Sequence, residues 1–192
     1  MSRAEGRSCF HARARIPAQP RRCVSPNPFV SVDPSGERVY VTYGSTSLYR
    51  SQDVYLAVFD SDLKPLLGVG KPKQVNPPGN FAGPDAFLPT STVDPKNGRL
   101  WACYYESGRG RARKAARYTC TVSSDGGKSW LTPRRVVRVA SDETVKHANR
   151  ANGYGDYEGV AALGGVAHAI WTDSRDLRRL REEVYTARLV ER

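Results

Sequence analysis

The feature that most constrains the fold of this 192-residue chain is a weak internal repeat with a period of about 60 residues. Asp33 and Asp94 stand 61 residues apart, and each is followed by a glycine-bearing turn and then by a run of β-forming residues. A third copy comprises Val160–Gly165 and Val166–Trp171. Each copy therefore has the pattern strand, tight turn, strand. Such a repeat restricts the chain to architectures built from successive small β units.

Each copy continues beyond its first hairpin. Third strands are predicted at Asp53–Phe59, Arg117–Val122 and Glu183–Leu189, and fourth strands of the first two copies at Lys73–Val75 and Arg134–Val139. Four antiparallel strands per repeat, arranged around an axis, form a blade of a β-propeller. A β-sandwich, which also has evenly spaced strands, is the alternative. The sequence therefore predicts an all-β fold of about three four-stranded antiparallel propeller blades, the last of them incomplete.

An incomplete propeller has two consequences for organisation. We expect residues 25–192 to form a partial propeller, either a piece of a larger one or a half that closes as a homodimer. Residues 1–24 are rich in arginine and proline, and we expect them to form a basic, disordered N-terminal arm. They contain no apolar run typical of a secretory signal, and no stretch of the chain approaches transmembrane length.

The charge is strongly positive, at +11, and it is concentrated in clusters of arginine. One interpretation is a surface that binds nucleic acid, and the other is a set of solvated loops. We favour the second, because no helix-turn-helix, zinc-finger or RNA-binding aromatic pattern accompanies the charge. Acidic glycans would also be attracted to such a surface. We therefore expect neither nucleic acid nor a membrane as a partner.

Cysteine and histidine spacing gives no sign of a metal site or another cofactor. The cysteines lack a Cys-x-x-Cys pattern, and His11, His147 and His168 show no metal-binding spacing. Cys103 and Cys120 lie on two strands that we expect to pair. They form either a disulfide, as in exported proteins, or a pair of buried free thiols.

The octapeptide Ser123–Trp130 lies between two predicted strands and reads Ser-Ser-Asp-Gly-Gly-Lys-Ser-Trp. The carboxylate of Asp125 can accept hydrogen bonds from its own turn, Gly127 allows a positive φ, and Trp130 returns a large ring to the sheet. An ordinary glycine-rich hairpin turn is the alternative. A degenerate copy, Asp60–Asp62, stands 63 residues earlier. The turn thus supports the repeat.

This octapeptide fits Ser-x-Asp-x-Gly-x-x-Trp, the pattern of the Asp-box or bacterial neuraminidase repeat. With Pro84–Pro89, Gly155–Gly159 and Trp171–Arg175, it makes residues 25–190 resemble sialidase-like propellers of the glycoside-hydrolase type. The resemblance implies that the Asp-boxes lie on outer turns away from the active site. It also implies a sialidase-like glycoside hydrolase, or a remnant of one, that is secreted or on the cell surface and acts on extracellular glycans. A non-catalytic propeller that binds glycan or protein is the alternative, since the box occurs in such proteins too.

Strand counting places the candidate site on the face opposite the Asp-boxes. There the starts of first strands and the ends of second strands come together. Paired carboxyls could catalyse cleavage of a glycosidic bond, and an arginine suits recognition of a sugar acid. The candidate catalytic residues are Asp85, Glu106, Asp156 and Asp173, and the candidate substrate-binding residues are Arg50, Tyr157 and Arg175. The structural alternative is that Asp156 and Asp173 bind loop N–H groups, that Tyr157 packs between blades, and that Arg175 pairs with Asp156 or Asp173 and holds the turn.

The sialidase pattern is incomplete. That family surrounds the substrate carboxylate with three arginines, and it uses a Tyr–Glu pair as nucleophile and an aspartate as acid/base. Arg175 could match one arginine and Arg50 another, but no third arginine stands at a clear inner-strand position. Tyr157 and Glu158 are adjacent, so on a regular strand they point to opposite faces. We therefore do not expect a full sialidase site in this chain alone.

Overall fold

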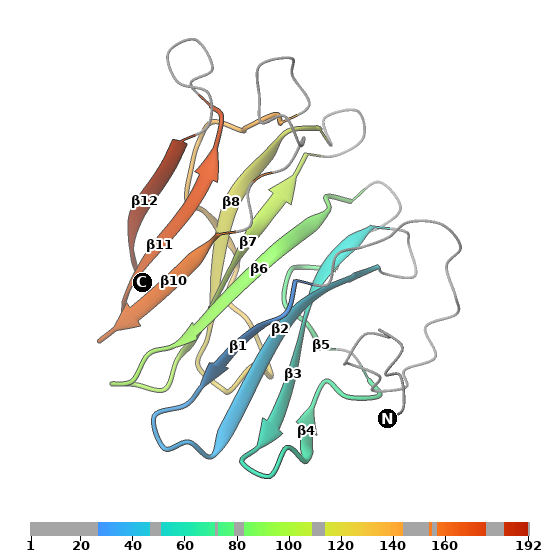
Figure 1. Cartoon of the computed structure of the whole chain (residues 1–192), viewed down its shortest axis with the longest axis vertical. Coiled ribbons are helices and arrows are strands. Elements are labelled where there is room, and N and C mark those ends of the chain that lie inside the picture. The colour runs from blue at the N-terminus through green and yellow to red at the C-terminus, as the bar shows by residue number, and fades with distance from the viewer. Residues whose placement is uncertain are drawn as a thin grey trace, which may run out of the picture.

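The structure is a computed structural model, and it describes residues 27–46, 51–71, 73–78, 83–108, 114–143, 154, 157–175 and 183–191. Its elements there are strands, which form three antiparallel sheets (Figure 1). We call them sheets A, B and C in chain order. The predicted all-β, antiparallel fold class is confirmed.

Sheet A contains β1 (Phe29–Val32), β2 (Arg38–Thr46), β3 (Gln52–Asp60), β4 (Pro65–Leu67) and β5 (Lys73–Gln74). The strands follow the order β1-β2-β3-β4, and β5 also pairs with β3. β4 was not predicted, because it is a three-residue edge strand that begins with a proline and pairs across a β-bulge. The outer position of this sheet is therefore shared by two short strands.

Sheet B contains β6 (Ala86–Val93), β7 (Leu100–Ser107), β8 (Ala116–Ser123) and β9 (Arg134–Arg135), in that order. The predicted fourth strand was too long, since only its first two residues form β9. β6 is also interrupted, because its register with β7 shifts between Phe87 and Thr90, and Leu88 has a φ of +50°. A positive φ at a leucine is uncommon and marks this bulge as a defined irregularity of the inner strand.

Sheet C contains β10 (Gly159–Leu163), β11 (Val166–Asp173) and β12 (Glu183–Val190). Its order is β10-β11-β12, and no fourth strand is found within the described residues. Strand β12 alternates half-buried and exposed residues along its whole length. One face of this sheet therefore packs against the protein and the other faces outward.

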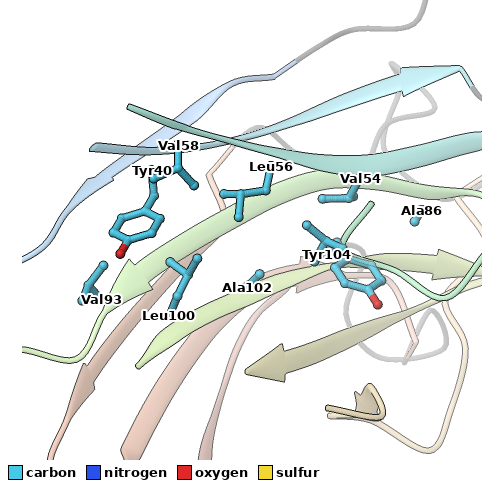
Figure 2. Close-up of a cluster of buried hydrophobic side chains, with 10 residues drawn as sticks. Tyr40, Val54, Leu56, Val58, Ala86, Val93, Leu100, Ala102 and Tyr104 are labelled. Atoms are coloured by element: carbon cyan, nitrogen blue, oxygen red, sulfur yellow. The ribbon is translucent and has the colours of Figure 1, made fainter. Parts of the chain in front are cut away.

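The three sheets pack face to face in series, with sheet B in the middle. Between sheets A and B lies a cluster that includes Tyr40, Leu56 and Val58 from one sheet and Leu100 and Tyr104 from the other (Figure 2). A second cluster, with Tyr105, Tyr118, Cys120, Ala169 and Trp171 among its members, joins sheets B and C. Strand β6 contacts both β1 and β10. The first strands of the sheets are therefore neighbours, as the inner strands of a propeller are.

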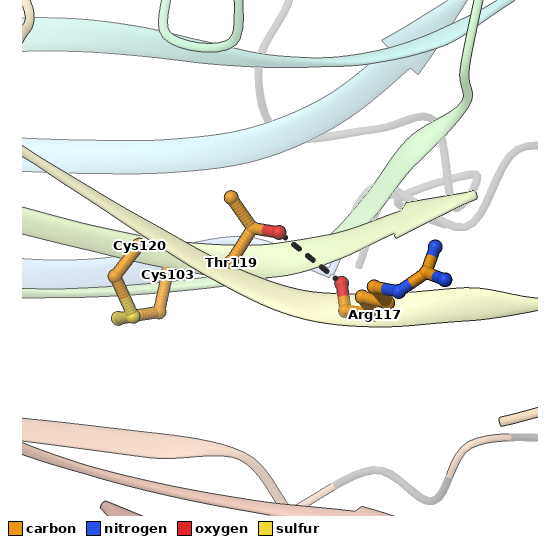
Figure 3. The surroundings of a disulfide bond; sticks show 4 residues. All are labelled: Cys103, Arg117, Thr119 and Cys120. Carbon is orange, nitrogen blue, oxygen red and sulfur yellow. Dashed lines mark hydrogen bonds between the residues drawn. A yellow bond between two sulfur atoms is a disulfide. The ribbon is translucent and has the colours of Figure 1, made fainter. Parts of the chain in front are cut away.

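A disulfide joins β7 to β8. Cys103 and Cys120 are directly opposite in the strand register, and their sulfurs are bonded (Figure 3). On β8, the Thr119 hydroxyl donates a hydrogen bond to the Arg117 carbonyl at 3.3 Å. Both cysteine side chains lie in the cluster between sheets B and C. The disulfide alternative is thus confirmed over free thiols.

Candidate functional site

The candidate site lies at the end of sheets B and C where β6 and β10 begin and β7 and β11 end. Asp85 directly precedes β6, and Glu106 is near the end of β7. Asp173 ends β11, Arg175 follows it, and Tyr157 comes just before β10. Asp156 and Arg50, also expected here, lie outside the described residues. The topology therefore gathers the described candidates at one end of the two sheets.

Asp173 and Arg175 form a fixed pair. The Asp173 carboxylate accepts hydrogen bonds from the Trp171 indole at 2.9 Å and from the Arg175 Nε at 2.6 Å, and Arg175 Nη2 makes a further ion pair. The guanidinium carbon lies 3.8 Å from the ring centroid of Tyr185 and 5.6 Å from that of Trp171. A carboxylate fork and two rings thus hold the guanidinium in one orientation.

The outer edge of this guanidinium remains available. Hydrogen bonds from Arg175 reach Asp173 through Nε and Nη2, while Nη1 has no partner among the described residues. The Arg175 side chain is 20 % exposed. A ligand with two acceptor oxygens could therefore bind Nη1 and Nη2 without displacing the aspartate.

Stacked aromatic rings support the pair from below. Tyr118 stacks on Trp171 with ring centroids 5.1 Å apart, Trp171 on Tyr185 at 6.1 Å, and Tyr105 meets Tyr118 edge-on at 5.0 Å. The Tyr105 hydroxyl donates to the Thr172 carbonyl at 2.5 Å. This ring ladder ties β7 and β8 to β11 and β12. The Arg175 guanidinium therefore packs on rings that are themselves fixed by neighbouring rings.

Tyr105 and Tyr118 of this ladder, and the neighbouring Tyr154, stay protonated. Burial, and then the nearby charge of Glu158, raise the pKa of Tyr105 and of Tyr118 well above the usual value. Burial likewise raises the pKa of Tyr154, whose ring lies 4.7 Å from that of Tyr105. These phenols therefore serve as packing groups and hydrogen-bond donors at physiological pH.

A buried carboxylate links the edge of sheet B to the end of β11. The Oε1 atom of Glu143, which is 1 % exposed, accepts hydrogen bonds from the hydroxyls of Ser141 and Ser174 and from the Ser174 backbone N–H. Ser141 is itself bridged to Ala116 at the start of β8. These hydrogen bonds, which we call the Glu143 clasp, fix the backbone immediately before Arg175.

The other two candidate catalytic carboxyls that the structure describes, Asp85 and Glu106, also have structural partners. Asp85 Oδ1 accepts a hydrogen bond from the Gln52 backbone N–H at 2.9 Å, which joins sheet B to sheet A. Glu106 pairs with Arg135 at 3.6 Å. By strand alternation Glu106 faces sheet A together with Tyr104, whereas Asp173 belongs to sheet C on the other side of sheet B. The structure therefore does not bring Glu106 and Asp173 together across one cleft.

Tyr157 is 87 % exposed, so it offers an open ring beside the start of β10 rather than packing between sheets. Sequence reasoning missed the ring ladder and the Glu143 clasp. The spacing of Trp171 and Asp173, two residues apart on one strand face, could have indicated their contact. No comparable signal marks Glu143, because it lies in an irregular segment whose partners are distant in sequence.

The turn Ser123–Trp130 lies at the opposite end of sheet B, since Ser123 pairs with Leu100 at the start of β7. The Ser123 hydroxyl accepts from the Gly127 N–H at 2.8 Å, and Asp125 accepts from the Ser129 N–H at 2.8 Å. Burial disfavours the Asp125 charge, but hydrogen bonds from Ser129, from the Ser123 hydroxyl and from the Lys128 backbone outweigh it and lower the pKa of Asp125 to about 2. Trp130 packs against the cluster between sheets A and B.

At this same end a carboxylate joins sheets B and C. Asp94 is fully buried and accepts the backbone N–H groups of Gly164 and Gly165 at 2.9 and 2.6 Å, and that of Lys96 at 2.9 Å. Burial opposes its charge, but the bonds from Gly165, Lys96 and Gly164 prevail and lower the pKa of Asp94. The turn between β10 and β11 is therefore held by the turn between β6 and β7.

Within the part of the chain that the structure describes, no group of three or more histidine, cysteine, aspartate or glutamate side chains could hold a metal ion. Over the same residues, no helix is long and apolar enough to cross a membrane.

The fold is similar to those of several solved proteins, among them an arabinanase and a sialidase. An α-L-arabinanase from Penicillium chrysogenum, complexed with arabinobiose, superimposes with a TM-score of 0.60 at 14 % identity, and the match covers 87 % of this chain and 46 % of that one. A Hadza microbial sialidase gives 0.54 at 12 % identity, covering 85 % and 35 % of the two chains. An N-acetylgalactosamine deacetylase from F. plautii, in complex with blood group B trisaccharide, gives 0.51 at 13 %, covering 90 % and 52 %.

The chain therefore spans between about a third and a half of the length of these three proteins. At such low identity the likeness concerns the fold alone. The chain matches no protein-family model and no curated protein.

Proposed function

We propose that this chain is part of a sialidase-like β-propeller that binds glycans at the end of the sheets around Arg175. Sheets A, B and C would be three successive blades, the third with three strands among the described residues. Three features support this arrangement: the serial face-to-face packing of antiparallel meanders, the adjacent first strands, and the Asp-box pattern of Ser123–Trp130.

The observation that carries the proposal is the fixed guanidinium of Arg175 with its open outer edge. Because Asp173, Trp171 and Tyr185 already hold it, little side-chain entropy would be lost when a ligand binds. A planar fork with two remaining donors matches a carboxylate, so an acidic sugar fits best. The exposed ring of Tyr157 offers an apolar surface for a sugar face.

Binding without turnover is better supported than hydrolysis. A glycosidase needs two carboxyls, about 5–9.5 Å apart, one acting as acid and the other as base or nucleophile. Asp85, Glu106 and Asp173 each have a structural partner, and two of them lie on different sides of sheet B. Hydrolysis by Asp85, Asp156, Asp173 or Glu106 is the second candidate, and the sialidase and arabinanase folds favour it.

A location outside the cell or on its surface belongs to the same proposal. The bond between Cys103 and Cys120 supports it, because structural disulfides persist mainly in oxidising compartments. Extracellular glycans with acidic sugars would then be the partners. The positive net charge of the chain favours their approach.

Titration calorimetry with sialyllactose, and with lactose as the matched neutral sugar, tests the binding site. We expect measurable binding of sialyllactose alone, lost in Arg175→Gln and retained in part in Arg175→Lys. The control variant is Arg188→Gln, which removes one positive charge from an exposed position on β12. Equal binding of both sugars, or equal loss in Arg188→Gln, would contradict the proposal.

A fluorogenic sialoside separates the two candidate functions. If the chain only binds, fluorophore release will stay at the uncatalysed rate while sialyllactose still binds. Turnover that disappears in Asp173→Asn but persists in Arg188→Gln would replace the binding function by the hydrolase.

A further inference from the structure

A small pocket lies between the outer strands of sheets B and C. Its buried lining includes Trp101 and Val122, which are partners in the β7–β8 register, and Leu189 of β12 packs against both. Leu131 and Val190 also line it and are 50 % and 42 % exposed, so the pocket opens between them. Its volume is about 230 Å³. Pockets for drug-sized molecules are larger, at about 300–1,000 Å³, so this one suits a small ligand.

Hydrogen bonds fix the two walls of the pocket. In sheet B, the Leu131 carbonyl accepts from the Thr121 hydroxyl at 2.6 Å, and the Leu131 N–H donates to the Val122 carbonyl at 3.0 Å. In sheet C, the N–H of Glu191, another lining residue, donates to the Gly165 carbonyl at 3.4 Å. A pocket with fixed walls loses little conformational entropy when a ligand binds.

The indole of Trp101 brings an unused hydrogen-bond donor to this pocket. Trp101 is 4 % exposed, and its Nε1–H has no hydrogen-bond partner among the described residues. Buried polar groups are nearly always hydrogen-bonded, because an unpaired one has lost its contact with water and gained nothing in return. An acceptor oxygen of a bound ligand would satisfy this group.

The charge of the pocket is positive. Arg134 on β9 lines it and reaches from sheet B to sheet C, where its Nη1 donates to the Val190 carbonyl at 3.3 Å. Nε and Nη2 of Arg134 have no partner among the described residues. Glu191 is the acidic lining residue, but it forms an ion pair with Arg99. The charge of Arg134 is therefore left uncompensated, which favours an anionic ligand.

We propose that this pocket binds a small monocarboxylate whose body is a single aromatic ring or a short branched hydrocarbon chain. The carboxylate accepts hydrogen bonds from the Arg134 guanidinium and from the Trp101 indole, and the apolar body packs on Val122 and Leu189. A cationic ligand would be repelled by the arginine. The pocket shares no residue with the glycan site around Arg175, and the proposal does not rest on glycan binding.

Ligand-observed fluorine NMR with para-fluorobenzoate tests the pocket on the full chain. Every titration uses the Arg175→Gln background, because the Arg175 guanidinium is a second place where a carboxylate could bind. We expect saturable line broadening at millimolar concentration or below, within the affinity that so small a ligand allows. The neutral control of similar shape, para-fluorobenzyl alcohol, should bind about tenfold more weakly, because it makes no charge-assisted hydrogen bond.

Variants of the lining residues locate the binding. Arg134→Gln should weaken para-fluorobenzoate binding about tenfold, because one charge-assisted hydrogen bond is lost. Arg138→Gln is the matched control, since Arg138 is exposed in the same segment but does not line the pocket. Trp101→Phe removes the indole N–H and keeps an aromatic ring, so it should weaken binding severalfold. Far-UV circular dichroism of each variant establishes that its sheets are intact.

The outcomes are distinct. Absence of saturable binding at millimolar concentration would overturn the proposal. So would equal affinities for the acid and the alcohol, equal weakening by the two arginine variants, or unchanged affinity in a folded Trp101→Phe variant. If Trp101→Phe does not fold, the comparison of Arg134→Gln with Arg138→Gln decides alone. Absence of sialyllactose binding by the wild-type chain, together with Arg134-dependent binding of para-fluorobenzoate, would refute the proposed function and leave this inference standing.

Discussion

Gly127 is the position where one added methyl group should test how the sheets pack. It lies in the turn after β8 with a φ of +89°, and a Cβ built on it would fall 2.1 Å from Cδ2 of Leu56. Leu56 is a fully buried residue of sheet A, so this glycine allows the turn of sheet B to approach the neighbouring sheet. Gly127→Ala should therefore both strain the backbone and overpack the cluster between the sheets.

Gly126 provides a matched control. Its φ is +73°, similar to that of Gly127, but its added Cβ would meet the end of the Arg38 side chain at 3.2 Å. That arginine is exposed and can move. The left-handed backbone costs each alanine about 1–2 kcal/mol. Overpacking against Leu56 should add about 1–3 kcal/mol at Gly127 only.

Urea unfolding followed by tryptophan fluorescence measures the two free energies of unfolding. We expect losses of about 2–5 kcal/mol for Gly127→Ala and about 1–2 kcal/mol for Gly126→Ala. In the double variant Gly127→Ala/Leu56→Ala the loss should be smaller than the sum of the single losses, because the clash is removed. Equal losses in the two glycine variants, or strictly additive losses in the double variant, would refute this packing of the turn.

Three further measurements address other contacts. The pKa of Asp94 is lower in the folded protein than the value of about 3.9 expected when the chain is unfolded. The charged carboxylate therefore stabilises the fold above about pH 3.9, and this stabilisation is lost as the pH falls through the folded-state pKa. Asp94→Asn should thus make the free energy of unfolding depend less on pH in the acid range. Burial, and then the Asp53 charge, raise the pKa of Tyr55 to about 12. The stability that the neutral phenol contributes is therefore lost as the pH rises from about 10 through about 12. Tyr55→Phe should reduce the fall in the free energy of unfolding over this range. Replacing Cys103 and Cys120, 17 residues apart, by alanine should lower the unfolding free energy by about 3 kcal/mol, and in non-reducing mass spectra the wild-type thiols should resist alkylation.

The repeat in the sequence predicted the sheets because strand pairing follows local patterns. The third strands expected from β-rich runs correspond to β3, β8 and β12 within one or two residues. The degenerate turn after β3 also repeats the geometry of its counterpart. Asp60 Oδ1 accepts the N–H groups of Asp62 and Lys64, as the Ser123 hydroxyl accepts those of Asp125 and Gly127. The Asp60 carboxylate therefore accepts hydrogen bonds from the residues two and four positions later, as the Ser123 hydroxyl does in the other turn.

The features that sequence reasoning missed depend on tertiary contacts. The Leu88 bulge has no glycine to mark its positive φ, so the surrounding sheets must stabilise it. Glu143 contacts Ser174, 31 residues away, through a segment with no regular pattern. Among the candidate site residues, sequence reasoning placed Asp173 and Arg175 at one strand end. It gave a pairing of Arg175 with Asp156 or Asp173 only as an alternative, because the choice of partner depends on side-chain conformation, and the structure shows the pairing with Asp173.

Hydrogen bonding at the two ends of the sheets separates stability from recognition. At the turn end, the Asp94 carboxylate is satisfied by backbone N–H groups of sheets B and C, so it has no capacity left for a ligand. At the other end, Arg175 is held by Asp173 but keeps one edge open. Asp94→Asn should therefore lower stability and leave sialyllactose affinity unchanged, whereas Arg175→Lys should lower affinity more than stability. If Asp94→Asn weakened both equally at temperatures where it is fully folded, the two ends would be coupled, and the separation argued from these contacts would be wrong.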